Sequence, residues 1–124
     1  MTVLVDSDVV IEVTRGRNQD VVSRWVELST SETPVLYSPV TAAELWAGAL
    51  PHEQKLIREL FRPMKCVVID EEIGRQAGDY LRQYRRSHNL ELADVLIAAS
   101  AIYSHAALWT RNRKHFPMKG LEFY

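Results

Sequence analysis

The fold is decided first by the segment VLVDSDVVI at residues 3–11. Its first three residues are valine and leucine, and so short an apolar run predicts a buried strand. The strand ends at Asp6, and apolar residues resume after Asp8 as the start of a short helix that should end near Gly16. A strand that passes directly into a helix is the first unit of an α/β pattern.

Three further apolar runs predict strands along the rest of the chain. They lie at residues 35–37, 66–69 and 106–110, and a fifth strand could end at Phe123. The run at 106–110 is the weakest of these, because it contains two alanines, which are depleted in strands.

Apolar residues at helical spacing occupy the intervals between these strands. Asp20 and Asp70 are candidate N-caps, and Thr41 and Glu44 have the spacing of a capping box. Residues 92–103 are apolar nearly all round, which is typical of a helix buried in the middle of a domain. We therefore expect a three-layer α/β/α sandwich with a mainly parallel central sheet of four or five strands.

Size and charge limit the alternatives. The 124 residues suffice for one domain, 1–124, and 47% of them are hydrophobic, enough to build one core. Fifteen Lys and Arg residues against sixteen Asp and Glu residues give a net charge of −1. This balance gives no general argument for binding a polyanion, so any such partner would need a local basic patch.

The cysteine content and the termini bear on the compartment. Cys66 is the only cysteine, so no internal disulfide can form, and we expect it to be a buried small hydrophobe in a reducing environment. The first six residues lack the basic leader of a signal peptide. The longest stretch without Asp, Glu, Lys or Arg, residues 95–110, is shorter than the about 20 apolar residues of a membrane span. We expect a cytoplasmic protein with no membrane partner.

Four polar side chains are predicted to meet at one edge of the sheet. Asp6 follows the first strand, Glu44 lies on the helix after the second, Asp94 lies early in the apolar helix, and Asn112 follows the fourth strand. Sites in open α/β sheets form outside the carboxyl ends of the strands. We therefore expect these four residues to share one site.

Asp94 is the most informative of the four. It interrupts LADVLIAA at residues 92–99, where a buried carboxylate would be costly unless it were hydrogen-bonded, paired or bound to a metal. No basic residue lies three or four positions away in either direction, although a cap or a tertiary ion pair could also account for it. Taken alone, Asp6 could be a turn residue and Glu44 a capping residue.

Together these carboxylates favour a hard divalent cation. With no Cys and His cluster, an oxygen site of this kind suits Mg²⁺ or Mn²⁺ better than zinc. Such an ion can polarise a phosphodiester and neutralise charge during its cleavage, which indicates a nuclease that has Asp6, Glu44, Asp94 and Asn112 in its catalytic site. Asp8 would be either a supporting carboxylate or, slightly favoured, a helix N-cap.

A basic run follows the fourth strand. Its members are Arg111, Arg113, Lys114 and His115, and they adjoin the predicted metal site, where a phosphate backbone would pass. They are therefore candidates for holding the substrate, which would be RNA if the family resemblance described below applies, and His115 is also a candidate general base. The alternative is an ordinary solvated surface.

Four segments together resemble the PIN-domain family. They are VLVDSDVVI (3–11), AELWAG (43–48), LADVLIAA (92–99) and WTRNRKHF (109–116). The first contains an acid in a D-[TS]-[NSD] triplet, the second a Glu-Leu pair with a following glycine, and the third an aspartate before Ile-Ala-Ala. Their order and spacing agree with the family over nearly the whole chain.

The length and compactness are most similar to the VapC-type toxins of toxin–antitoxin pairs. That resemblance implies a Mg²⁺- or Mn²⁺-dependent endoribonuclease that inhibits translation, forms a homodimer and is held inactive by a cognate antitoxin. It also implies that Asp6, Glu44 and Asp94 bind the metal. Many relatives have an acid where this chain has Asn112, so this chain departs from the pattern there.

Two other classes share parts of the pattern. In a haloacid-dehalogenase-like phosphatase, Asp6 would be the nucleophile of a D-x-D motif, but no late acidic pair completes that site. In a receiver-type signalling module, Asp70 would accept a phosphoryl group, but the Thr and Lys that such a module needs would be Thr110 and Lys114, which lie too close together. A pure interaction module would result if the site were degenerate.

Overall fold

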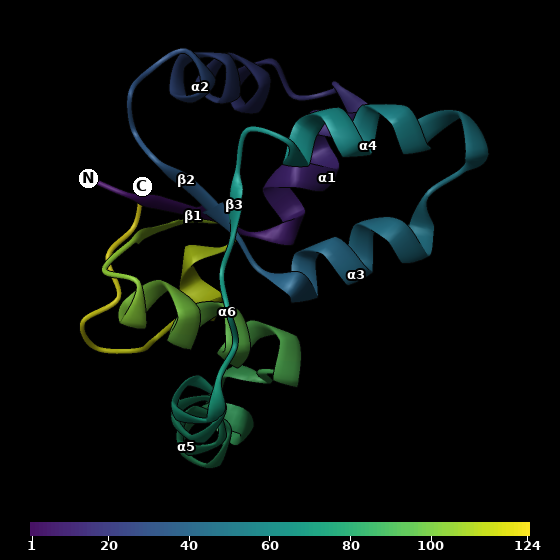
Figure 1. Ribbon diagram of the computed structural model, residues 1–124. Helices are drawn as coiled ribbons and strands as arrows, with labels where there is room; N and C mark the ends of the chain where they lie inside the picture. The colour runs from purple at the N-terminus through teal and green to yellow at the C-terminus, as the bar shows by residue number, and fades with distance from the viewer.

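The computed structural model describes residues 1–124 as an alternation of strands and helices (Figure 1). The elements are, in order, β1 (Val3–Val5), α1 (Ser7–Arg15), α2 (Gln19–Ser29), β2 (Val35–Tyr37), α3 (Pro39–Gly48), η1 (Pro51–Glu53), α4 (Gln54–Phe61), β3 (Lys65–Cys66), α5 (Glu71–His88), α6 (Leu92–Tyr103), β4 (Ala107–Trp109) and η2 (Arg113–His115).

The sheet has four parallel strands in the order β3-β2-β1-β4. This confirms the predicted α/β sandwich with a parallel sheet. The expected fifth strand is only an isolated bridge between Leu108 and Phe123. The expected strand at 66–69 is also wrong in its extent, because β3 ends at Cys66 and Val68 is 79% exposed at the edge of the sheet.

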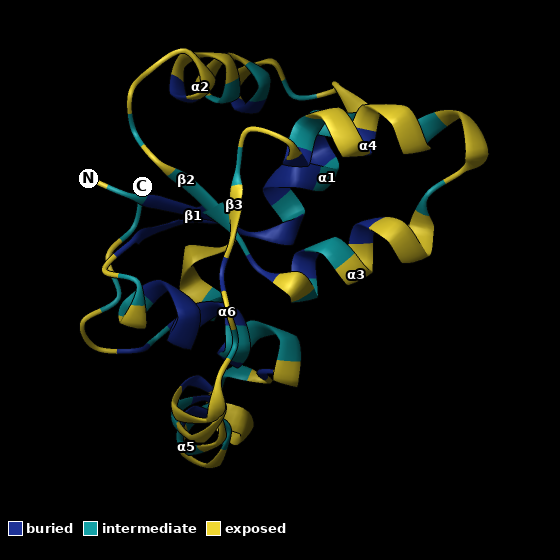
Figure 2. Ribbon diagram, in the orientation of Figure 1, coloured by how far each residue is buried: buried dark blue, intermediate teal, exposed yellow.

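Alternate residues of the strands supply two separate cores. Leu4 and Leu108 pack with α5 and α6 on one face of the sheet, whereas Val3, Val5 and Trp109 pack with helices α1 to α4 on the other. Figure 1 shows these two helical layers on opposite sides of the strands, and Figure 2 shows β1 buried between them. The central strand β1 is therefore fully covered, and its carboxyl end lies between the layers.

The helix that follows β1 is bounded by the residues expected at its ends. Asp6 caps α1 by accepting a hydrogen bond from the Ser7 backbone N–H, and Gly16 ends it at φ +65°. This left-handed conformation favours glycine. Asp8, which was slightly favoured as the cap, lies instead within the first turn of α1.

Two other predicted caps are wrong. Asn18, not Asp20, caps α2 through the backbone N–H of Val21. Helix α3 begins earlier than expected, with Ser38 as its N-cap. Thr41 and Glu44 therefore lie inside α3 and do not form a capping box, which frees both side chains for contacts outside the helix.

Surface exposure corrects one further expectation. The Cys66 side chain is exposed, not buried.

Helix α6 has six fully or nearly fully buried residues, which confirms it as the central helix of its layer. None of the helices combines the length and the apolar character needed to cross a membrane.

Candidate functional site

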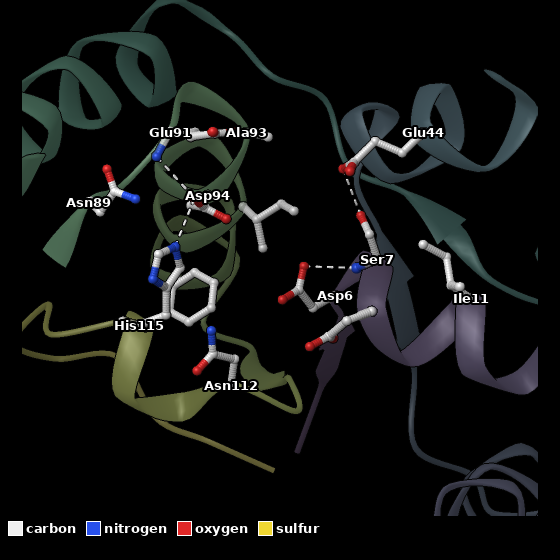
Figure 3. A pocket seen from close by; sticks show the side chains of 13 residues that line it. Asp6, Ser7, Ile11, Glu44, Asn89, Glu91, Ala93, Asp94, Asn112 and His115 are labelled. Carbon is white, nitrogen blue, oxygen red and sulfur yellow. Dashed lines mark hydrogen bonds and ion pairs between the residues drawn. The ribbon is translucent and has the colours of Figure 1, made fainter. Parts of the chain in front are cut away.

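The four side chains predicted to meet line one pocket of about 410 Å³ (Figure 3). Asp6 enters it from the end of β1, Glu44 from α3, Asp94 from the first turn of α6, and Asn112 from the loop after β4. The predicted convergence at the carboxyl end of the sheet is therefore confirmed. Five carboxylates line the pocket and no Lys or Arg does; the five are Asp6, Asp8, Glu44, Glu91 and Asp94.

Asp6 is the most deeply buried of these carboxylates, with 9% of the residue exposed. Its Oδ1 accepts a hydrogen bond of 2.7 Å from the Ser7 backbone N–H, and its Oδ2 accepts one of 2.8 Å from the Thr110 hydroxyl. Burial and the nearby charge of Asp8 nevertheless raise the pKa of Asp6 to about 6. The two hydrogen bonds oppose this rise without cancelling it.

Asp8 lies two residues after Asp6, in the first turn of α1. Its Oδ2 accepts a hydrogen bond of 3.1 Å from the Arg111 backbone N–H, while its Oδ1 is buried without any hydrogen-bond partner. Burial raises the pKa of Asp8 above its usual value. A buried carboxylate oxygen without a partner is uncommon in folded proteins, and Oδ1 is therefore free to accept a hydrogen bond from water or to bind an ion.

Glu44 is exposed and is held at the pocket wall by a chain of hydroxyl groups. Its Oε1 accepts a hydrogen bond of 2.9 Å from the Ser7 hydroxyl, which lies 2.9 Å from the Thr41 hydroxyl. Ser7 thus joins α1 to α3 beside the site. Sequence reasoning missed both hydroxyls, since it gave Ser7 no role and assigned Thr41 only to a capping box.

Asp94 is not the unpaired buried charge that the sequence suggested. About 26% of its side chain is exposed, and its Oδ2 accepts a hydrogen bond of 3.0 Å from the Glu91 backbone N–H. The same oxygen lies 3.0 Å from the Nε2 atom of His115. The cap and the tertiary pair that were the alternatives for Asp94 are therefore both present, and its partner comes from η2 and not from its own helix.

The basic run after β4 lies at the surface, and two of its arginines are held by other parts of the chain. Arg111 forms an ion pair of 3.0 Å with the buried Glu12. Arg113 donates a hydrogen bond of 2.8 Å to the Tyr124 carbonyl. Of the four residues, only His115 lines the pocket, and Lys114 is exposed beside it.

Thr110 is the second site residue that sequence reasoning missed. It is 6% exposed, and besides donating to Asp6 its hydroxyl accepts a hydrogen bond of 3.2 Å from the Asn112 backbone N–H. Thr110 therefore joins the end of β4 to the end of β1. Its position directly before Arg111-Asn112 was the only signal for it.

The structure gives Asp70, the phosphoryl acceptor of the receiver alternative, an ordinary capping role. Asp70 caps α5 by accepting a hydrogen bond from the Ile73 backbone N–H, and it does not line the pocket.

The donor set fits a hard divalent cation. All the candidate ligands except His115 present oxygen, and burial raises the pKa values of Asp6 and Asp8, so a bound cation would stabilise their ionised forms. The orphaned Asp8 Oδ1 supplies a further free oxygen. No three of these side chains surround a single point closely enough to hold an ion as they stand.

Comparison with known proteins gives a consistent result. The PIN-domain family model matches residues 3–119. The chain is 41% identical to Ribonuclease VapC10 of Mycobacterium tuberculosis, over 94% of this chain and 86% of that protein. It is 33% identical to Ribonuclease VapC19 of the same organism, over 93% and 92%. The fold is also similar to a crystal structure of VapBC2 from Rickettsia felis bound to a promoter DNA fragment, at a TM-score of 0.80, 19% identity and coverage of 100% and 98%. The chain belongs to the PIN-domain family.

Proposed function

We propose that this protein is a cytoplasmic Mg²⁺- or Mn²⁺-dependent endoribonuclease and the toxin of a toxin–antitoxin pair, which inhibits translation by cutting RNA. The observation that carries the proposal is the pocket lined by five carboxylates and by no Lys or Arg. Such a pocket repels a phosphodiester unless a cation is present. The relatives named as VapC ribonucleases support RNA as the substrate.

In this proposal Asp6, Glu44 and Asp94 hold the cation, and Asp8 and Asn112 complete the surrounding wall. When bound, the ion supplies Lewis-acid chemistry, which polarises the phosphodiester and neutralises the charge of its cleavage. Thr110 and Ser7 orient the acids through the hydrogen bonds described above. Lys114 is the exposed cation best placed to meet a phosphate of RNA, because Arg111 and Arg113 are held by Glu12 and Tyr124.

A hollow beside the pocket, in which apolar residues make up half of the lining, supports a protein partner. This hollow of about 410 Å³ shares Ile11 and Glu44 with the pocket and is also lined by Leu45, Leu50 and Ile57. Leu50 is 54% exposed. Exposed apolar surface next to a site is typical of a protein-binding region. An antitoxin segment in this hollow would cover the entrance to the pocket, in keeping with the toxin–antitoxin complexes among the structural neighbours.

We also propose that the protein forms a homodimer, as the resemblance to VapC-type toxins implies. Leu92 and Tyr103 support an apolar contact on the other helical layer. They lie about three turns apart on α6 and are 59% and 45% exposed. Sedimentation of the purified protein would show whether it is a dimer.

Asp94→Asn is expected to abolish RNA cleavage and to leave the fold intact. The amide can still accept the Glu91 hydrogen bond, but it removes the charge that attracts the cation. The measurement is cleavage of an end-labelled RNA in Mg²⁺ or Mn²⁺, for which we expect a loss of about 100-fold or more. Asp79→Asn is the matched control, because Asp79 is a half-buried acid on α5 that pairs with Arg82 away from the pocket. Cleavage by Asp94→Asn at the parent rate would contradict the assignment.

Asn112→Asp is expected to tighten Mg²⁺ binding by roughly tenfold, because it adds a charge to the wall of the site. The same change should destabilise the metal-free protein near neutral pH, since clustered carboxylates repel one another. Added Mg²⁺ should reverse that loss, because a ligand that binds only the native state stabilises it.

The measurements are calorimetric titration and thermal melts in chelator and in Mg²⁺. Asn18→Asp is the control, because it makes the same charge change at the cap of α2. Equal affinities and equal melting shifts for Asn112→Asp and the parent would place Asn112 outside the site.

A further inference from the structure

His115 makes a contact that the proposed chemistry does not yet use. It lies at the end of η2, and its Nε2 atom is 3.0 Å from Oδ2 of Asp94 (Figure 3). Both side chains are about one quarter exposed, at 25% and 26%. The contact joins residues 21 positions apart in sequence and links the loop after β4 to the first turn of α6.

Only one of the two carboxylate oxygens of Asp94 accepts hydrogen bonds. Oδ2 accepts hydrogen bonds from the Glu91 backbone N–H and from His115, both at 3.0 Å. No hydrogen bond to Oδ1 is formed. Figure 3 shows the Asp94 carboxylate facing Asp6 across the pocket, and the charge of Asp94 contributes to the raised pKa of Asp6. Oδ1 is therefore the oxygen of Asp94 that is free to bind a ligand.

The imidazole is itself held in place. Its ring meets that of Phe116 edge to face, with centroids 5.7 Å apart and planes at 87°. Phe116 is 5% exposed and belongs to the core between the sheet and α6. Arg113, two residues before His115, fixes η2 to the C-terminus through the Tyr124 carbonyl. A donor fixed in this way can determine the orientation of the carboxylate that accepts from it.

We propose that His115 is a positioning residue, which holds Oδ2 of Asp94 so that Oδ1 is presented to the cation. The inference rests on the proposed function, because it takes Asp94 to be a ligand. It does not depend on the protonation state of His115, since the neutral tautomer with a proton on Nε2 and the imidazolium both donate this hydrogen bond. Hydrogen bonds to ligating carboxylates typically change metal affinity by 10- to 100-fold.

The test is Mn²⁺ binding, measured by calorimetry and by electron paramagnetic resonance at one pH. His115→Ala should bind Mn²⁺ about 10- to 100-fold more weakly than the parent. His115→Gln should recover most of that loss, because its amide N–H can reach the same oxygen. Since His115 is partly exposed, both variants should fold, and a thermal melt in chelator checks this.

The matched control is His88→Ala. His88 is also half-buried and also meets an aromatic ring edge to face, that of Tyr84 at 6.0 Å and 90°, but it does not line the pocket. Its removal should leave the Mn²⁺ affinity unchanged. A purely structural role for His115 would give no recovery with glutamine, because an amide does not replace the packing of the imidazole against Phe116.

Two results would overturn the positioning role. One is an unchanged affinity in His115→Ala. The other is a nitrogen bound directly to Mn²⁺ in the parent spectrum and absent from His115→Gln, which would make His115 a ligand. Failure of the proposed function is distinct, because the parent would then bind no Mn²⁺, or Asp6→Asn would bind it as tightly as the parent. Either of those results would overturn the metal site and the role of His115 together.

Discussion

Asp6→Asn is expected to abolish RNA cleavage and at the same time to raise the melting temperature of the metal-free protein at pH 7.5. Cleavage is lost because the substitution removes the charge of a proposed metal ligand, the most buried one of the site. Stability is gained because burial, together with the charges of Asp8 and Asp94, raises the pKa of Asp6 from 3.8 to about 6. A rise of that size corresponds to a penalty of about 3 kcal/mol for the ionised form. Asparagine keeps the cap of α1 and avoids the penalty.

The gain should depend on pH with a definite sign. The pKa of Asp6 is higher in the folded than in the unfolded protein, so the folded state retains a proton that the unfolded state has released. The penalty is absent below about pH 4, grows as the pH rises towards 6, and is complete above that value. The stability of the parent therefore falls across this window, and the advantage of Asp6→Asn should be large at pH 7.5 and small at pH 4.

Thermal melts in chelator at the two pH values measure this difference. Asp70→Asn is the matched control, because Asp70 also caps a helix, but it is exposed and lies outside the pocket. The control should show no gain in stability at pH 7.5. An Asp6→Asn variant that melts below the parent at pH 7.5, or that differs from it equally at both pH values, would show that Asp6 carries no such penalty.

Thr110→Val is expected to destabilise the metal-free protein by about 1.5–3 kcal/mol at pH 7.5, the usual range for a hydrogen bond to a charged group. Valine has nearly the shape of threonine, but it removes the donor to Asp6 Oδ2 and the acceptor for the Asn112 backbone N–H. In the background of Asp6→Asn the cost should be smaller, because the ionised partner is gone.

Urea denaturation of the parent, the two single variants and the double variant measures this coupling. Thr14→Val is the control, because the Thr14 hydroxyl donates to the Ile11 carbonyl and not to a carboxylate. Its effect should add to that of Asp6→Asn within about 0.5 kcal/mol. Strict additivity of Thr110→Val with Asp6→Asn would show that the Thr110 hydroxyl does not stabilise the ionised carboxylate.

Local patterns in the sequence predicted the elements that their own residues determine. The strand at Val3–Val5 and the buried helix at Leu92–Tyr103 lie where the apolar runs indicated. Parallel pairing of the strands then brought Asp6, Glu44, Asp94 and Asn112 to one edge. These features could be predicted because the spacing of apolar residues and the geometry of a parallel sheet are enough to determine them.

The contacts that hold the site together could not be predicted in the same way. The Thr110 hydroxyl reaches Asp6 across 104 residues of sequence, and His115 reaches Asp94 across 21. Nothing in the neighbourhood of Asp94 indicates a partner that arrives from another element. Glu44 was assigned to a capping box because its spacing from Thr41 allows one, whereas Ser38 caps α3 in the folded protein. Local spacing cannot decide between partners that only the tertiary fold brings together.

The central claim is that the acidic pocket cuts RNA only when it holds a divalent cation. The most direct measurement is the single-turnover rate of RNA cleavage by chelator-treated protein while Mn²⁺ or Mg²⁺ is added back. We expect no cleavage in chelator, a rate that rises and saturates with the metal, and no cleavage by Asp6→Asn at any concentration. Cleavage that continues at full rate in chelator, or that Asp6→Asn retains, would contradict the account.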